Sequence, residues 1–94
     1  MVTMIDTGSD MCLMRADCYV KLNAPPLKEN KIYFRGIDSV SNETLGEFDA
    51  NISIDDSIYP IKIRVISDTL MRHDLIIGAD FLRTVEVRIN RAEF

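Results

Sequence analysis

Met4-Ile5-Asp6-Thr7-Gly8-Ser9 is the stretch that decides the fold of this 94-residue chain. The apolar run from Met1 to Ile5 is typical of a strand, and the four residues that follow it are turn formers. The sequence therefore predicts a carboxylate, that of Asp6, at the point where a strand enters a tight turn. Taken alone, the pattern also fits a plain strand-ending turn, so its meaning depends on the rest of the chain.

A second apolar stretch lies far downstream, at Leu75-Ile76-Ile77-Gly78. It has no polar break, which is typical of a strand that is buried on both faces. The residues from Ala79 to Arg83 predict a helical turn. Val85, Val87 and Ile89 alternate with charged residues and predict a last strand.

Short apolar runs between these stretches predict further strands. Met11 to Met14 is expected to be a strand, followed by one or two helical turns between Arg15 and Leu22. Lys31 to Arg35 predicts another strand. The segment from Gly36 to Gly46 is rich in Gly, Asp, Ser and Asn, so it predicts a long hairpin or loop.

A β-hairpin with one solvent-exposed face is expected after this loop. Phe48 to Ile54 alternates apolar and polar residues, and Asp55-Asp56-Ser57 predicts the turn. The apolar residues of the return strand also alternate with polar ones, and they are Tyr59, Ile61, Ile63 and Val65. With no repeat and no linker, residues 1–94 are expected to form a single all-β domain with one or two short helices.

Composition excludes several classes of function. The formal net charge is −4 and the basic residues are scattered, whereas nucleic-acid binding needs a basic footprint. No apolar run approaches the roughly 20 residues of a membrane span. Cys12 and Cys18 are expected to be buried thiols, and the single histidine, His73, lacks the spacing of a metal site. We therefore expect no metal, no nucleic acid and no membrane partner.

The two stretches in this order, with a glycine-bearing hairpin between them, resemble the retropepsin-like aspartic peptidases. Ile76 to Leu82 is similar to the gypsy-type retrotransposon members, and the resemblance runs from Met1 to about Ile89. It implies a half-barrel that forms a two-fold homodimer and cleaves its own polyprotein without a cofactor, in the cytoplasm or in retroelement particles. Family members usually carry a strand and a hairpin before the catalytic loop, and this sequence starts at the strand leading into that loop.

The resemblance assigns roles to the loop residues. Asp6 is the catalytic aspartate, Thr7 hydrogen-bonds across the dyad to the partner subunit, and Gly8 lets the substrate lie over the aspartate. Ser9 carries a hydroxyl that we expect to donate to the Asp6 carboxylate. The mechanism needs two aspartates and the chain has one Asp-Thr-Gly, so the second aspartate must come from another copy.

Substrate contacts are implied at further positions. Asp10 matches a residue that contacts the substrate main chain, although it also fits a backbone cap. Leu13, Ile76 and Ile77 would line side-chain pockets, or else belong to the core. Gly36 and Ile37 fall in the expected flap, unless Gly36 to Gly46 is an ordinary loop.

Two rival functions remain open at this stage. One is a domesticated or decayed copy that keeps the fold and acts as a dimerisation or binding module. The other is a cellular relative attached to ubiquitin-handling domains. Intact Asp6-Thr7-Gly8 argues against simple decay.

Overall fold

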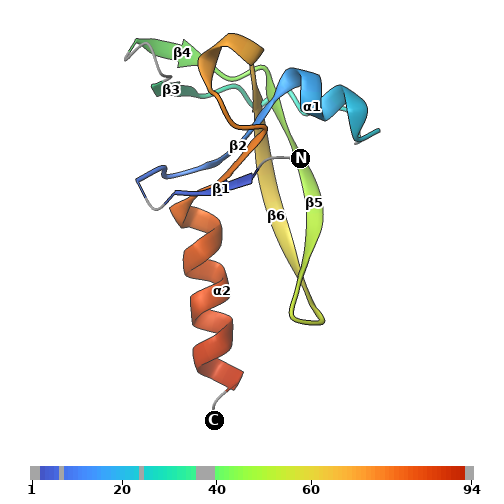
Figure 1. Cartoon of the computed structure of the whole chain (residues 1–94), viewed down its shortest axis with the longest axis vertical. Helices are drawn as coiled ribbons and strands as arrows, with labels where there is room; N and C mark the ends of the chain where they lie inside the picture. Colours follow the sequence, from blue (N-terminus) through green and yellow to red (C-terminus); the bar gives the residue numbers. More distant parts are fainter. Residues whose placement is uncertain (1–2, 7, 24, 36–39, 93–94) are drawn as a thin grey trace.

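The described part of the chain forms a small β-rich domain that also contains helices (Figure 1). The computed structural model describes residues 3–6, 8–23, 25–35 and 40–92, with the side chains of the last helix described as far as Val85. The elements in chain order are β1 (Thr3–Ile5), β2 (Cys12–Arg15), α1 (Ala16–Lys21), β3 (Tyr33–Arg35), β4 (Ser41–Glu43), β5 (Gly46–Ile54), β6 (Ser57–Ile66), the 3₁₀ turn η1 (Asp68–Leu70), β7 (Leu75–Ile77) and α2 (Ala79–Ala92).

The main sheet has five strands in the order β1-β7-β2-β6-β5, and β3 and β4 form a separate hairpin. β7 lies between β1 and β2, and it is parallel to β1 and antiparallel to β2. The register pairs Ile5 with Ile77 and Leu13 with Ile76. Segments far apart in the sequence are thus joined beside the Asp6 loop.

The β5–β6 hairpin forms as the alternating pattern predicts. Its turn is the pair Asp55 and Asp56, whose φ angles of 48° and 66° lie in the left-handed region. Two such residues are typical of a type I′ turn, whose twist matches that of the flanking strands. Tyr59, Ile61 and Ile63 are buried, whereas Lys62 between them is exposed.

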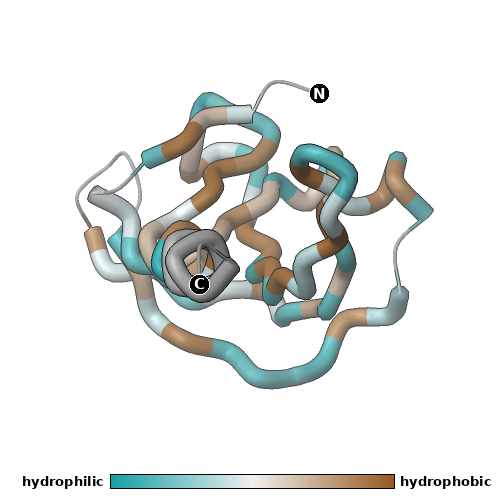
Figure 2. The backbone as a smooth tube through the Cα atoms, turned by 90° about the horizontal axis from the view of Figure 1, so that it is seen from below, coloured by the Kyte–Doolittle hydropathy of each residue, from teal (hydrophilic) through white to brown (hydrophobic). Residues whose placement is uncertain are grey.

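Apolar side chains form two clusters, one on each face of the main sheet. Because successive strand residues point to opposite faces, Cys12 and Met14 belong to the larger cluster and Leu13 to the smaller one. Phe34, Ile66 and Met71 complete the buried part of the smaller cluster. Figure 2, seen from below, shows hydrophobic (brown) segments crossing the interior of the fold and hydrophilic (teal) segments along much of its rim. Cys12 and Cys18 are buried free thiols, as expected.

The expected last strand is wrong, because Val85, Val87 and Ile89 lie in the helix α2. Phe81, Val85 and Ile89 are spaced four residues apart, so the same residues also fit a helical stripe. A helix satisfies its backbone groups internally, whereas a strand needs a neighbouring strand. α2 runs beside β6 (Figure 1), and the Phe81 ring meets the Tyr59 ring edge-on at a centroid distance of 6.2 Å.

Other boundaries differ slightly from the expected ones. β1 is described from Thr3, since Met1 and Val2 lie outside the described residues, and β3 starts at Tyr33 rather than Lys31. With 14 residues, α2 is longer than the short helices expected. In the part of the chain that the structure describes, no helix has the length and apolar character needed to cross a membrane.

Candidate active site

Asp6 is held at the end of β1 by three backbone contacts. Its N–H donates to the Ile77 carbonyl at 3.0 Å, which ties the residue to the end of β7. Its carbonyl accepts the Ser9 N–H at 3.1 Å and closes the turn. Its Oδ1 accepts the Gly8 N–H at 2.9 Å, so the carboxylate is fixed in one orientation.

Gly8 packs close to this carboxylate. A Cβ built at Gly8 would lie 3.1 Å from Asp6 Oδ1, which is closer than ordinary van der Waals contact. The absence of a side chain therefore leaves room for both the carboxylate and the backbone hydrogen bond. The expected contact of Thr7 with a partner subunit falls on a residue outside the described ones.

The expected hydrogen bond from Ser9 to the Asp6 carboxylate is wrong. The Ser9 hydroxyl donates instead to the Met11 carbonyl at 2.8 Å. A hydroxyl has one proton to donate, and the turn that brings the Ser9 N–H to Asp6 leaves its Oγ facing the following residues. Ser9 therefore shapes the loop and does not touch the carboxylate of Asp6.

The start of α2 is hydrogen-bonded to the loop that follows Asp6. The Ala79 N–H donates to the Ser9 carbonyl at 2.7 Å, and the Asp80 N–H donates to the Asp10 carbonyl at 3.3 Å. The first N–H groups of a helix have no partner within the helix, so they are available for such contacts. The glycine of the second sequence stretch, Gly78, is packed against the backbone of the same loop.

Cys12 links α2 to the strand that leaves the loop. Its Sγ accepts the Gly78 N–H and donates to Asp80 Oδ1, both at 3.4 Å. Burial raises the pKa of the Cys12 thiol to about 11, and the negative charge of Asp80 acts in the same direction. The thiol therefore stays protonated and serves as a hydrogen-bond donor. The sequence pattern indicated only that Cys12 would be buried.

A cavity of about 260 Å³ opens beside Asp6. Gly8 and Ser9 share its wall with Asp6, and β3 contributes Phe34 and Arg35. The remaining lining residues are apolar, and they are Leu13, Ile66, Leu70, Met71 and Ile76. The carboxylate thus borders a space suited to an apolar side chain.

Only some of the predicted pocket residues line this cavity. Leu13 and the half-buried Ile76 do so, and their contact with a substrate stays a prediction. Ile77 does not, because alternation along β7 points it to the opposite face, where it is buried in the larger core cluster. Phe34 and Met71 were not anticipated, since nothing local in the sequence shows which apolar residues face a cavity.

A second cavity of about 370 Å³ adjoins the first and shares five lining residues with it, namely Gly8, Ser9, Leu13, Phe34 and Arg35. Asp10, Met11 and Leu13 line it, together with all three residues of β3. Asp10 is exposed, and no hydrogen bond joins its carboxylate to another described residue. The backbone-cap interpretation of its side chain is therefore not supported.

β3 and β4 pair as an antiparallel hairpin on either side of residues 36–39, for which the resemblance implied a flap. Its base is closed by Thr44, whose N–H donates to the Ile32 carbonyl at 2.8 Å and whose hydroxyl accepts the Ile32 N–H at 3.0 Å. Thr44 is only 1% exposed, so this closure is shielded from water. The expected substrate contacts of Gly36 and Ile37 fall on residues outside the described ones.

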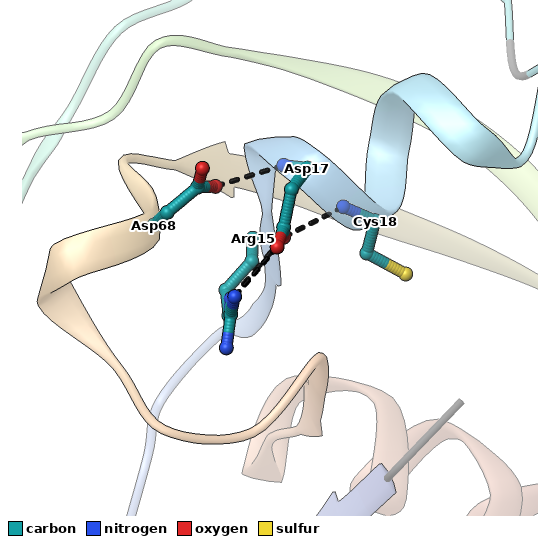
Figure 3. A network of polar contacts seen from close by, with 4 residues as sticks. All are labelled: Arg15, Asp17, Cys18 and Asp68. Carbon is teal, nitrogen blue, oxygen red and sulfur yellow. Dashed lines mark hydrogen bonds and ion pairs between the residues drawn. The ribbon is translucent and has the colours of Figure 1, made fainter.

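A polar network fixes the turn η1, which supplies Leu70 to the first cavity. The Asp17 N–H at the start of α1 donates to Asp68 Oδ1 at 2.8 Å (Figure 3). Arg15 pairs with the Asp17 carboxylate, and this hydrogen bond holds the pKa of Asp17 below its usual value. Segments 51 residues apart in sequence are thereby joined next to the cavity.

Comparisons with known proteins give distant structural likeness alone. No protein-family model and no curated protein matches the chain. It is similar in structure to Lpg0085 from Legionella pneumophila subsp. pneumophila str. Philadelphia 1, a protein with unknown function (DUF785), with 17% identity and a TM-score of 0.46. The match covers 83% of this chain and 69% of that one. Within the described residues, no group of three or more His, Cys, Asp or Glu side chains could hold a metal ion.

Proposed function

We propose that this chain is a retropepsin-like aspartic endopeptidase, one half of a homodimer that processes the retroelement polyprotein containing it. The observation that carries the proposal is the Asp6 carboxylate. It follows a strand, is oriented by the Gly8 N–H, and borders an apolar cavity walled by the β3–β4 hairpin.

Two carboxylates held close together can hydrolyse a peptide bond with water alone. Like charges a few ångström apart cannot both ionise, so such a pair shares one proton. The ionised member removes a proton from the attacking water, and the protonated member gives one to the substrate carbonyl. The proposed reaction uses no metal or cofactor.

The second carboxylate is proposed to come from another copy of the chain. Among the described residues that line the 260 Å³ cavity, Asp6 is the only carboxylate. A two-fold axis beside Asp6 would bring the same loop of each copy face to face, because a two-fold interface pairs identical patches. Each copy would then supply one half of the dyad.

The substrate is proposed to bind as an extended peptide along the loop and β2. Asp10 lies in the second cavity, where its exposed carboxylate can accept N–H groups of the peptide main chain. The apolar wall formed by Leu13, Ile76 and their neighbours would take a side chain beside the cleaved bond.

The test is the exchange Asp6→Asn. The amide oxygen can still accept the Gly8 N–H, so the fold should persist, whereas proton transfer is lost. Cleavage of a polyprotein-derived peptide should fall by about 10²–10⁴-fold or more. Asp55→Asn, in the exposed β5–β6 turn, is the matched control and should cleave at the wild-type rate.

Wild-type activity in the Asp6→Asn protein would contradict the proposed mechanism. A dimeric but inactive wild-type protein would favour the binding module over the peptidase. Inhibition of the wild type by a transition-state mimic of peptide hydrolysis would support the peptidase.

A further inference from the structure

Arg35 belongs to the wall that the two cavities of the candidate active site share. It is the last residue of β3, and it lines both the cavity that contains Asp6 and the cavity that contains Asp10. Among the described lining residues of either cavity, it is the only cation. A residue with a positively charged side chain therefore forms part of the wall of both spaces in which the proposed substrate would lie.

The guanidinium of Arg35 is available for a ligand. Some basic side chains of the described region pair with carboxylates, as Lys28 does with Asp49 and Lys62 with Glu47. No ion pair or hydrogen bond joins the Arg35 side chain to a described residue, and this includes Asp10 across the second cavity. Arg35 is also exposed, so a substrate side chain can reach it.

Packing of its neighbour holds Arg35 in this position. Phe34 is buried in the cluster with Leu13 and Ile66, and this burial anchors β3 beside both cavities, while the adjacent Arg35 is exposed. On β4, Ser41 is the register partner of Arg35. The hairpin thus presents the charge from a strand and not from an irregular loop.

We propose that Arg35 is a specificity-determining residue that binds an acidic side chain of the substrate, close to the apolar residue at the cleaved bond. This inference rests on the proposed function. A guanidinium matches a carboxylate with two parallel hydrogen bonds, and its planar donors make that match directional. The favoured substrates are therefore extended peptides in which Asp or Glu lies near an apolar residue.

Matched peptides test this inference. Each pair differs only by Glu or Gln at one position within three residues of an apolar cleaved bond, and kcat and KM are measured for both. The wild type should cleave the Glu peptide better at one position, by roughly threefold to tenfold in kcat/KM, because an accessible ion pair contributes modestly. The gain should lie in KM and shrink in high salt.

Variants of Arg35 test whether this residue causes the preference for Glu over Gln. In Arg35→Met the Glu-to-Gln ratio of kcat/KM should fall to about one, and in Arg35→Lys part of the preference should return. Arg35→Glu should prefer Lys at the same position. Arg83→Met removes an exposed charge on α2, outside both cavities, and should leave the ratio unchanged.

Two failures are distinguishable. If the peptides are cleaved but the wild type does not discriminate Glu from Gln at any position, or if Arg35→Met keeps the preference, this inference is wrong and the proposed function stands. If no peptide is cleaved by the wild type, the proposed function is wrong and this inference falls with it.

Discussion

Gly78 lies so close to Met11 that a Cβ at position 78 would stand 2.2 Å from the Met11 carbonyl oxygen. It would also lie 2.5 Å from the carbonyl carbon and 2.9 Å from the nitrogen of Met11. All three contacts are with backbone atoms, which cannot move away by a change of rotamer as the end of a flexible side chain can. The glycine of the second sequence stretch is thus required by the close approach of the end of β7 to the loop that follows Asp6.

Gly78→Ala should destabilise the protein by about 3 kcal/mol or more, at the upper end of what overpacking usually costs. The added methyl group can be accommodated only if the loop from Ser9 to Met11 moves. Chemical unfolding measures the change, with Ser53→Ala on the exposed face of β5 as the control. A decrease of the free energy of unfolding by less than about 1 kcal/mol would contradict this prediction, because it would mean that the loop can move at little cost.

Ser9→Ala should weaken the loop without changing its acid–base behaviour. The variant loses the hydrogen bond to the Met11 carbonyl, which is worth about 1 kcal/mol. Since the hydroxyl does not touch the Asp6 carboxylate, the acid limb of the pH–rate profile should stay in place. A shift of that limb would restore the direct contact with Asp6 that the sequence suggested.

Activity should require two copies of the chain. Specific activity should fall on dilution as the dimer dissociates, and sedimentation should show the same midpoint. In an equal mixture with Asp6→Asn, random pairing of subunits should reduce the rate to about a quarter, where independent chains would keep half. A monomer with concentration-independent specific activity would rule out the homodimer.

Stability should fall in alkaline solution because of Cys12. The pKa of Cys12 in the folded protein is about 11, above the usual 9.0. The stability that the protonated thiol contributes is therefore fully present below pH 9 and is lost as the pH rises towards 11. The loss between pH 8 and pH 10.5 should be about 2 kcal/mol. Over the same interval, the stability of Cys12→Ala should fall by about 2 kcal/mol less than that of the wild type. Cys18 is present in both proteins, so its own titration affects both in the same way. Equal pH dependence in both proteins would contradict the assignment.

Asp56→Gly should stabilise the β5–β6 hairpin. Asp56 has a φ of 66° at the second position of the turn, where type I′ turns favour glycine. Relief of the left-handed conformation should contribute about 0.5–1 kcal/mol, reduced by the extra freedom of glycine in the unfolded chain. Asp55→Gly is the comparison, since the first position accepts Asp well. The midpoint of thermal unfolding should rise more in Asp56→Gly than in Asp55→Gly. An equal or larger rise in Asp55→Gly would contradict strain at Asp56.

Local spacing determined much of the fold. The alternation in Phe48–Ile54 and around Ile61 predicts the β5–β6 hairpin, because burial of one sheet face imposes a period of two. Turn formers predicted the break after Ile5 and the turn at Asp55. Each of these features depends on residues close together in the sequence, so the sequence alone was sufficient.

Contacts between distant segments decided the rest. Val85 and Ile89 fit either a strand or a helix, and the helix forms because it needs no neighbouring strand and its first N–H groups bind the loop carbonyls of Ser9 and Asp10. Ile76 and Ile77 look alike in the sequence. One lines the cavity and the other joins the core, because β7 is placed between β1 and β2 with one particular face towards Phe34 and Met71. Spacing along a chain shows which residues share a face, and only the packing of other segments against that face determines what it contacts.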